Sequence, residues 1–241
     1  MFIPLPRADL TALIASARAQ GRTVLSEPES KAFLCAIGIS CPSGRVIKTA
    51  ADAAAVAGAI GFPVVVKVVS HALTHKTDAG GVVFPVERPA AAVAACELIA
   101  ERVRHARPDI VLDGFLIESF RPAKLEWILS LRMDPHYGPV IMFGLGGMFV
   151  ELLGQVSFRL APLSGADIDS MLADKLVARA LSGIRGDGPA DQESLKAAIA
   201  ALSNLSTQNE IAAAIAEIEI NPLIVTESGV LALDALIVLR S

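Results

Sequence analysis

The chain has 241 residues, of which 53% are hydrophobic and 19% charged, and its formal net charge at pH 7 is −4. This apolar content excludes a disordered chain, and the acidic balance excludes a broad basic surface for nucleic acid. The most apolar windows, residues 53–66 and 137–150, are interrupted by Gly and Pro and are shorter than the roughly 20 residues that a membrane-spanning helix needs.

The N-terminal segment does not form the apolar run of a secretory signal, because Pro4, Arg7 and Asp9 interrupt it. We therefore expect a cytoplasmic protein without a membrane segment. From Leu10 to Ala17 the apolar residues recur at helical spacing, which predicts a first helix that ends at Gly21. Residues 1–24 are expected to form this N-terminal helix and its flanks.

The next part of the chain, residues 25–112, is predicted to be a compact lobe of one sheet and several helices. Ser26 and Glu29 have the spacing of a capping box, which predicts a helix that ends at Gly38. The other expected elements are strands at 45–48, 63–69 and 80–86 and helices at 49–61 and 89–107.

From residue 113 to residue 241 the pattern predicts a second, larger lobe. Strands are expected at short intervals, at 114–120, 124–133, 139–143, 148–153 and 156–161, which indicates an antiparallel meander. A helical stretch at 164–206, interrupted at 183–189, is followed by strands at 217–225 and 230–239. This alternation of helices and strands predicts an α/β or α+β fold with two lobes.

Lys67 lies within residues 64–69, a run that otherwise consists of valines. A buried ammonium group without a partner is costly, so Lys67 must meet an anion, either a structural carboxylate or the phosphate of a ligand. The alternative is an edge strand from which the side chain reaches water.

The segment that follows, residues 71–82, combines His71, His75, a lysine, an aspartate and a Gly pair. Functional sites concentrate in loops after buried strands. His75 could transfer protons, bind a metal or carry a phosphoryl group. The simpler alternative is a polar turn before the next strand.

The glycine-rich segment 143–149 is similar to a dinucleotide-binding loop only at first sight, because Phe149 replaces the third glycine and a strand is expected to follow. We expect a turn between antiparallel strands, with close approach to a phosphate as the alternative.

Polar residues alternate with isoleucines near the C-terminus. Glu217, Glu219 and Asn221 should project from one face of a strand while Ile218 and Ile220 fill the core. This alternation predicts a row of oxygen atoms on one face of the sheet.

A four-residue turn at 226–229 would pair Val225 with Val230 and would place Asn221 opposite Asp234, with Cβ atoms roughly 5 Å apart. Asp234 is the one charged residue in the second strand, 230–239. Hard oxygen ligands in this arrangement favour a Mg²⁺ site. The alternative is an exposed polar face of hydrogen-bonded Asn and Asp.

Single carboxylates also occur in apolar strands, at Glu118 and Glu126, but neither position by itself assigns a role. The three cysteines, Cys35, Cys41 and Cys96, lack the spacing of a zinc site or a disulfide framework. We expect them to be small buried hydrophobic residues.

Taken together, a lysine in a buried strand, a Gly-rich loop and an acid/amide pair on a late strand resemble the ATP-grasp fold, whose two lobes hold a nucleotide between them. Seven motifs, in order, are similar to the ATP-grasp (β) subunit of ADP-forming acyl-CoA synthetases of the acetate–CoA ligase type, relatives of the succinyl-CoA synthetase β chain. The motifs are Gly61-Phe-Pro-Val-Val-Val-Lys67, His75-Lys-Thr-Asp-Ala-Gly-Gly-Val82, Asp134-Pro-His-Tyr-Gly-Pro-Val140, Gly144-Leu-Gly-Gly147, Phe158-Arg-Leu-Ala-Pro162, Gly183-Ile-Arg-Gly186 and Glu219-Ile-Asn-Pro-Leu223.

This resemblance implies a role for particular residues. It implies that His75 is a phosphoryl carrier and that Glu219 is the acid that supports it. It implies nucleotide-binding and metal-binding sets as well. The nucleotide-binding set is Lys67, Glu118, Ser119, Phe120 and Glu126, and the Mg²⁺ ligands are Asn221 and Asp234.

The family's reaction implies the cofactors and the partner. An acyl-CoA and phosphate give an acyl phosphate in a CoA-binding α subunit, a histidine of that partner takes the phosphoryl group, and the group then reaches ADP in the β subunit; every step is reversible. The chain has no CoA-binding Rossmann module, so the resemblance implies a hetero-oligomer with an α subunit or domain, and ATP or ADP with Mg²⁺ as cofactors.

Two other functions are compatible with an ATP-grasp fold. One is a ligase that joins a carboxylate directly to an amine or thiol, which needs no phosphohistidine, so His75 argues against it. The other is a regulatory module that binds nucleotide without turnover, and the intact set of Lys67, His75, Asn221 and Asp234 argues against that. Lys67→Met is expected to weaken nucleotide binding and to stabilise the unliganded protein, because an apolar side chain of similar volume replaces a desolvated cation.

Overall fold

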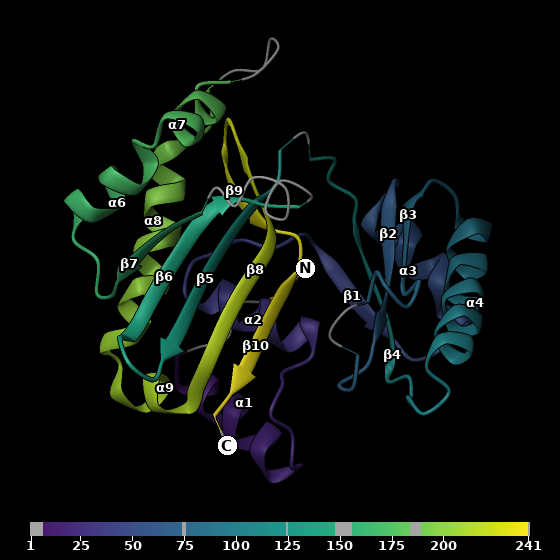
Figure 1. The fold of residues 1–241 in the computed structure, drawn as a ribbon. Helices are drawn as coiled ribbons and strands as arrows, with labels where there is room; N and C mark the ends of the chain where they lie inside the picture. The colour runs from purple at the N-terminus through teal and green to yellow at the C-terminus, as the bar shows by residue number, and fades with distance from the viewer. Residues whose placement is uncertain (1–6, 74–75, 124, 148–155, 184–188, 241) are drawn as a thin grey trace. The chain divides into compact units, whose positions relative to one another are not determined.

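The structure, a computed structural model, describes residues 7–73, 76–123, 125–147, 156–183 and 189–240 (Figure 1). The chain forms two compact units. Among the described residues, the first unit contains 26–29 and 42–122, and the second contains 7–25, 30–41 and those from 123 onward.

The first unit is a four-stranded antiparallel sheet with two helices packed on it. Its strands are β1 (Gly44–Ile47), β2 (Val64–Val69), β3 (Val82–Val86) and β4 (Gly114–Ser119), in the order β1-β4-β2-β3. Helix α3 (Ala53–Ile60), preceded by the 3₁₀ turn η1 (Ala50–Asp52), and helix α4 (Pro89–Ala106) contact the sheet and each other (Figure 1).

Burial explains why these segments form this unit. All six residues of β2 are buried, as expected for a strand with neighbours on both edges. The buried positions of α4 recur at helical spacing, at Ala92, Ala95, Cys96, Ile99 and Val103. The small residues among them, Ala92, Ala95 and Cys96, let α4 lie close to the sheet.

The second unit is built on a six-stranded antiparallel sheet. The strand order is β10 (Ala235–Leu239), β8 (Ile215–Thr226), β5 (Trp127–Asp134), β6 (Gly138–Leu145) and β7 (Val156–Leu160), and β9 (Gly229–Ala232) also pairs with β8 (Figure 1). Trp127 stacks on Phe143 across β5 and β6, with ring centroids 5.2 Å apart. The β5-β6-β7 segment confirms part of the predicted meander, whereas the strand expected at its start, 114–120, belongs to the first sheet as β4.

Helices complete the second unit. They are α1 (Arg7–Ala19), most of α2 (Glu27–Ala36), α6 (Gly165–Leu172), α7 (Lys175–Leu181), α8 (Gln192–Asn204), the 3₁₀ turn η2 (Leu205–Thr207) and α9 (Asn209–Ala214). Helix α8 packs against β5, β6 and β9, and α1 packs against α9. The core of this unit joins residues from α1, α2 and the sheet.

The division into units differs from the boundary expected at residues 112 and 113. Strand β4 pairs with β1 and β2, so it completes the first sheet, and the chain passes to the second unit after Pro122. Among the described residues of the expected N-terminal element, 7–24 do not form a separate unit either, because α1 packs in the second unit. Tertiary pairing, which has no local sequence signal, decides both points.

Two further expectations concern single segments. The strand expected at 230–239 is divided into β9 and β10, with Leu233 and Asp234 outside both. The strand expected at 148–153 lies outside the described residues, as do most of the residues at the interruption of the helical stretch, 184–188.

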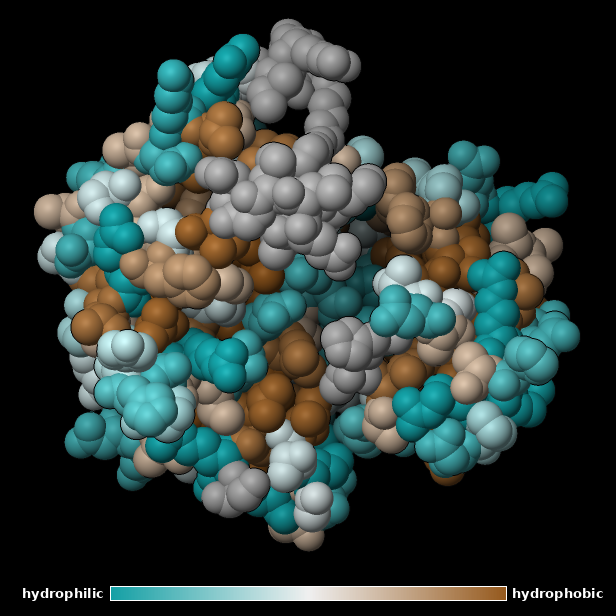
Figure 2. Space-filling view, viewed as in Figure 1, coloured by the Kyte–Doolittle hydropathy of each residue, from teal (hydrophilic) through white to brown (hydrophobic). Residues whose placement is uncertain are grey.

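The surface mixes apolar and polar residues, in agreement with the amino-acid composition. Brown and teal residues are interspersed over the face drawn in Figure 2. Among the described residues, no helix has the length and apolar character that crossing a membrane requires.

Candidate functional site

Lys67 is the centre of a buried cluster of four charged groups in the first unit. Its Nζ lies 2.6 Å from Oε1 of Glu27 and 3.2 Å from Oε2 of Glu118. The Nζ of Lys76 lies 3.1 Å from the other carboxylate oxygen of Glu27. We call Glu27, Lys67, Lys76 and Glu118 the Lys67 cluster. Its formal charge is zero, because two ammonium groups face two carboxylates.

Strand register explains how Lys67 meets Glu118. On the β2/β4 pair, Lys67 lies opposite Leu116 and Val65 lies opposite Glu118, so Lys67 and Glu118 share one face as diagonal neighbours. The side chain of Lys67 is 9% exposed and that of Glu118 is 1% exposed. Strand β2 lies inside the sheet, so the interpretation of Lys67 as an edge-strand residue reaching water is wrong.

Glu27 is the first residue of α2, and the start of that helix holds it in place. The carboxylate of Glu29 accepts hydrogen bonds from the backbone N–H of Ser26 at 2.8 Å and from the Ser26 hydroxyl at 2.7 Å. The predicted Ser26/Glu29 pair is therefore present at the helix start. Sequence reasoning assigned no role to Glu27, which has the pattern of an ordinary first-turn acid, and it interpreted Lys76 as a charge that steers phosphate without placing it beside Glu27.

The structure describes the segment between β2 and β3 except at residues 74 and 75. His71 is tied to Asp113, whose Oδ2 accepts the backbone N–H of His71 at 3.1 Å and lies 3.5 Å from His71 Nε2. Residues 74 and 75 lie outside the described residues, so the structure does not test the prediction for His75.

A tight turn at Lys76–Gly81 leads into β3. The N–H of Gly81 donates to the carbonyl of Lys76 at 2.7 Å. A Cβ at Gly81 would lie 2.6 Å from Cγ1 of Val68 and 2.9 Å from the Lys76 carbonyl oxygen. Only glycine fits there without displacing its neighbours, and Lys76 is thereby held beside Glu27 by both backbone and side chain.

The end of β4 carries the other predicted nucleotide residues of the first unit. The N–H of Ser119 donates to the carbonyl of Ser43 at 2.9 Å, and the N–H of Phe120 donates to that of Pro63 at 3.0 Å. The ring of Phe120 stacks on Phe84, with centroids 5.6 Å apart. Phe84 is 60% exposed, so this pair offers a flat apolar surface at the end of the strand.

In the second unit, the predicted register of the last strands is confirmed. Val225 pairs with Val230, and Leu223 with Ala232. On the other side of the break, Ile220 pairs with Ala235 in the same register. Asn221 therefore stands opposite Asp234.

The polar face of β8 is also confirmed. Ile218 and Ile220 are buried, whereas Glu217, Glu219 and Asn221 are partly exposed. The amide Nδ2 of Asn221 lies 3.5 Å from Oε1 of Glu219.

Carboxylate and amide oxygens of this kind suit Mg²⁺. Asp234 Oδ1 accepts the N–H of Ala235 at 2.8 Å, which orients the carboxylate. Among the residues that the structure describes, no group of three His, Cys, Asp or Glu could hold a metal by itself. A cation at Asn221 and Asp234 would therefore take further ligands from phosphate and water.

Glu126 lies beside the glycine-rich segment. Its carbonyl accepts the N–H of Gly146 at 2.7 Å. A Cβ at Gly147, where φ is +58°, would lie 2.5 Å from Oε2 of Glu126, and one at Gly146 would lie 2.7 Å from the Trp127 carbonyl carbon. The glycines thus allow the chain to pass closely over the start of β5. Residues 143–145 of the expected turn lie in β6, and residues 148 and 149 lie outside the described residues.

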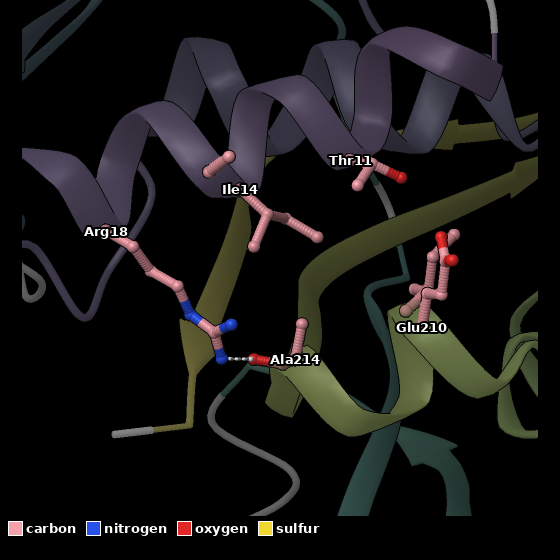
Figure 3. A pocket seen from close by; sticks show the side chains of 7 residues that line it. Thr11, Ile14, Arg18, Glu210 and Ala214 are labelled. Carbon is pink, nitrogen blue, oxygen red and sulfur yellow. Dashed lines mark hydrogen bonds between the residues drawn. The ribbon is translucent and has the colours of Figure 1, made fainter.

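A pocket in the second unit lies elsewhere and contains none of these residues. It has a volume of about 320 Å³ and lies between α1 and α9, where Thr11, Ile14, Arg18, Glu210 and Ala214 line it (Figure 3). The Arg18 guanidinium already donates to the carbonyls of Ala214 and Arg240. We assign the pocket to the packing of the two helices.

The two antiparallel units, the buried lysine of β2 and the acid/amide pair of β8 and Asp234 together are typical of nucleotide-binding ATP-grasp proteins. A family model described as an ATP-grasp domain matches residues 16–239. The chain therefore belongs to the ATP-grasp family.

More specific relatives are similar over the whole chain. The β subunit of acetate–CoA ligase (ADP-forming) I from Pyrococcus furiosus is 37% identical over 227 residues, which cover 94% of this chain and 96% of that subunit. The β subunit of acetate–CoA ligase (ADP-forming) II from the same organism is 35% identical, and the match covers 95% of this chain and 97% of that subunit.

A solved structure is similar to the same extent. It is that of the dinucleotide-forming acetyl-coenzyme A synthetase 1 of Candidatus Korarchaeum cryptofilum with coenzyme A and Ca-AMPCP. It has a TM-score of 0.89 and 39% identity, and the match covers 95% of this chain and 99% of that one. Another structure of that enzyme, with coenzyme A and Mg-AMPPCP, is described with its phosphohistidine segment pointing towards the nucleotide-binding site.

Proposed function

We propose that this chain is the nucleotide-binding β subunit of an ADP-forming acid–CoA ligase. The observation that carries the proposal is that the similarity extends over nearly the full length of both chains. The match covers 96% of an acetate–CoA ligase β subunit and 94% of this chain. The chain transfers a phosphoryl group between a phosphohistidine and ADP, and acyl-CoA, ADP and phosphate are converted reversibly to carboxylic acid, CoA and ATP.

The first unit supplies groups for the nucleotide. Lys67 and Lys76 are the ammonium groups available to phosphate oxygens, and each can exchange a carboxylate oxygen of Glu27 for a phosphate oxygen. Ammonium groups on flexible stems bind phosphate as point charges. Ser119 and Phe120, at the end of β4, contribute backbone carbonyls and an apolar ring surface to the base, and Glu118 holds Lys67 in position.

The second unit supplies groups for Mg²⁺. Asn221 and Asp234 hold the cation through their oxygens, and the bound cation neutralises phosphate charge during transfer. Glu219, within hydrogen-bonding reach of Asn221, is the acid that orients the phosphoryl-carrying imidazole, and Glu126 completes the nucleotide set beside Gly147.

His75 is the proposed phosphoryl carrier. A neutral imidazole is nucleophilic near pH 7, and a covalent carrier divides the transfer into two steps that are shielded from hydrolysis. His71 is the rival, but its backbone and ring are engaged with Asp113. We therefore assign a structural role to His71.

The partner is a CoA-binding α subunit, which supplies the acyl phosphate and makes the enzyme a hetero-oligomer. Relatives that cover this chain almost completely carry the name subunit β, which supports a division of the reaction between two chains. A direct carboxylate–amine ligase and a regulatory module remain the alternatives that the experiment must separate.

The test reconstitutes the enzyme. The chain is purified alone and together with the CoA-binding α subunit of its own organism, and ATP formation from acetyl-CoA, ADP, phosphate and Mg²⁺ is measured. We expect turnover only in the complex, and acid-labile, base-stable phosphate on this chain after incubation of the complex with ATP. Ligation of a carboxylate to an amine by the chain alone would establish the direct ligase instead.

Two matched variants test the carrier. His75→Ala is expected to lose acyl-CoA-dependent ATP formation in the complex while it retains nucleotide binding, and His71→Ala is expected to keep turnover. Full turnover by His75→Ala would remove the carrier role from that residue but leave the subunit assignment intact.

A further inference from the structure

Two aromatic rings of the first unit meet across strand β2. This strand separates β3, which carries Phe84, from β4, which Phe120 follows. The two rings nevertheless stack, with centroids 5.6 Å apart and planes inclined by 23°, so the pair spans β2. The N–H of Phe120 donates to the carbonyl of Pro63, the residue directly before β2, which places the pair at the start of that strand.

Strand alternation places Phe84 on the face of the sheet that carries Lys67. Val66 and Val83, which pair with each other, pack in the core beside α3 and α4. Lys67 and Phe84 each come directly after one of these valines, and successive side chains of a strand point to opposite faces. Both therefore lie on the face turned away from the helices.

The spacing between the ammonium group and the aromatic pair suits a phosphorylated nucleoside. Val64, the first residue of β2, precedes Lys67 by three residues. Three residues of a strand span roughly 10 Å. A nucleoside diphosphate, in which a ribose separates the base from the phosphates, can therefore lie along β2 with its base at the rings and its phosphates at Lys67.

The exposure of the two rings differs. Phe84 is 60% exposed, whereas Phe120 is half-buried. Phe84 therefore has ring surface that no other side chain of the described residues covers. Aromatic side chains with a few charged groups close by are typical of sites for small ligands. Here the charged groups are those of the Lys67 cluster, on the same face.

We propose that Phe84 is a base-stacking residue of the nucleotide site, and that its ring extends the apolar surface that Phe120 supplies. This inference rests on the proposed function and adds to it a residue that sets the affinity for the base. Aromatic rings stack on any base, because every base has a π-face. Phe84 therefore contributes affinity for the ring system and no choice between adenine and guanine.

Calorimetry with two probes tests this assignment on the full chain. ADP with Mg²⁺ reports on base and phosphates together, and pyrophosphate with Mg²⁺ reports on the phosphates alone. Phe84→Ala is expected to weaken ADP binding roughly 5–150-fold, the range for losing one base–aromatic stack. Pyrophosphate binding should not change, because pyrophosphate has no base. Unchanged ADP binding, or an equal loss for both probes, would overturn the assignment.

Three further variants separate stacking from other effects. Phe84→Tyr keeps a ring and should retain the ADP affinity of the wild type, whereas Phe84→Leu is apolar without a ring and should lose affinity. Tyr137→Ala removes an aromatic side chain that is 73% exposed between β5 and β6, and it should bind ADP like the wild type. Wild-type affinity in Phe84→Leu would refute stacking.

Failure of the proposed function would be visible in a different protein sample. A wild-type chain that binds neither ADP nor pyrophosphate would refute the nucleotide role itself, and the assignment of Phe84 with it. A wild-type chain that binds both probes, together with a Phe84→Ala variant of equal ADP affinity, would refute the assignment of Phe84 alone.

Discussion

Replacing Lys67 by methionine should destabilise the protein, which is the opposite of what the sequence predicts for a cation without a partner. In the structure, Lys67 neutralises Glu118 and shares Glu27 with Lys76. Lys67→Met leaves two buried carboxylates with one ammonium group, and removing one partner of a buried ion pair costs about 3–5 kcal/mol. For a chain of this size that corresponds to a fall in Tm of roughly 6–20 °C.

A second substitution gives the prediction its control. In Lys67→Met/Glu118→Leu the remaining Glu27 and Lys76 balance each other, and an apolar pair replaces the ionic one, which is often nearly neutral in stability. We expect the double variant to be more stable than Lys67→Met alone. The coupling of the two substitutions should exceed about 1 kcal/mol, within the range that contacting residues show.

Urea unfolding measures both effects, provided that the midpoint moves while the slope m stays constant. Nucleotide affinity, measured by calorimetry with Mg²⁺ and ADP, should fall in both variants because each lacks the Lys67 ammonium group. A Lys67→Met protein as stable as the wild type would refute the ionic account of the Lys67 cluster. Unchanged ADP affinity in the double variant would remove the phosphate role of Lys67.

Three further predictions concern other parts of the chain. Asp234→Asn retains an acceptor for the N–H of Ala235 but loses a charged ligand of the proposed Mg²⁺ site. Calorimetry should show that Mg²⁺-dependent ADP binding is weakened by at least roughly 10–100-fold, which is the effect of losing even an outer-shell partner of a metal. Gly81→Ala should lower the free energy of unfolding in urea by about 1–3 kcal/mol, whereas Gly58→Ala, where a Cβ meets nothing within 4 Å, should not lower it. The side chain and N–H of Ser194 lower the pKa of Asp191, so this cap of α8 stabilises above the unfolded pKa and is lost as pH falls through the folded one. The Tm difference between wild type and Asp191→Ala should therefore be present at pH 7 and should shrink progressively as the pH falls below about 4.

Local rules were sufficient for the strand register of the proposed metal site. The pairing of Asn221 with Asp234 follows from the length of one turn and the two-residue repeat of a strand, both of which the sequence displays. The break between β9 and β10 could not be predicted in the same way. The sequence pattern predicts strand for Leu233 and Asp234, and only the tertiary context keeps them out of the hydrogen-bonded strands.

The Lys67 cluster shows where sequence reasoning stops. The sequence required an anion for Lys67, and the anion is Glu27, forty residues earlier, together with Glu118, fifty-one residues later. No periodicity links positions so far apart. Cys35 and Cys41 were expected to be buried like Cys96 but are half-buried, for a related reason, because exposure at a helix end depends on what packs over it.

The neutrality of the Lys67 cluster bears on how an anion is attracted to this protein. A chain with a net charge of −4, in which the ammonium groups of Lys67 and Lys76 are already matched by carboxylates, has little long-range attraction for a polyanion. Bulk salt screens exposed charges over about 10 Å at 0.1 M but acts weakly on buried pairs. Nucleotide capture would then depend on the exchange of one set of short hydrogen bonds for another, and its rate would be nearly independent of ionic strength.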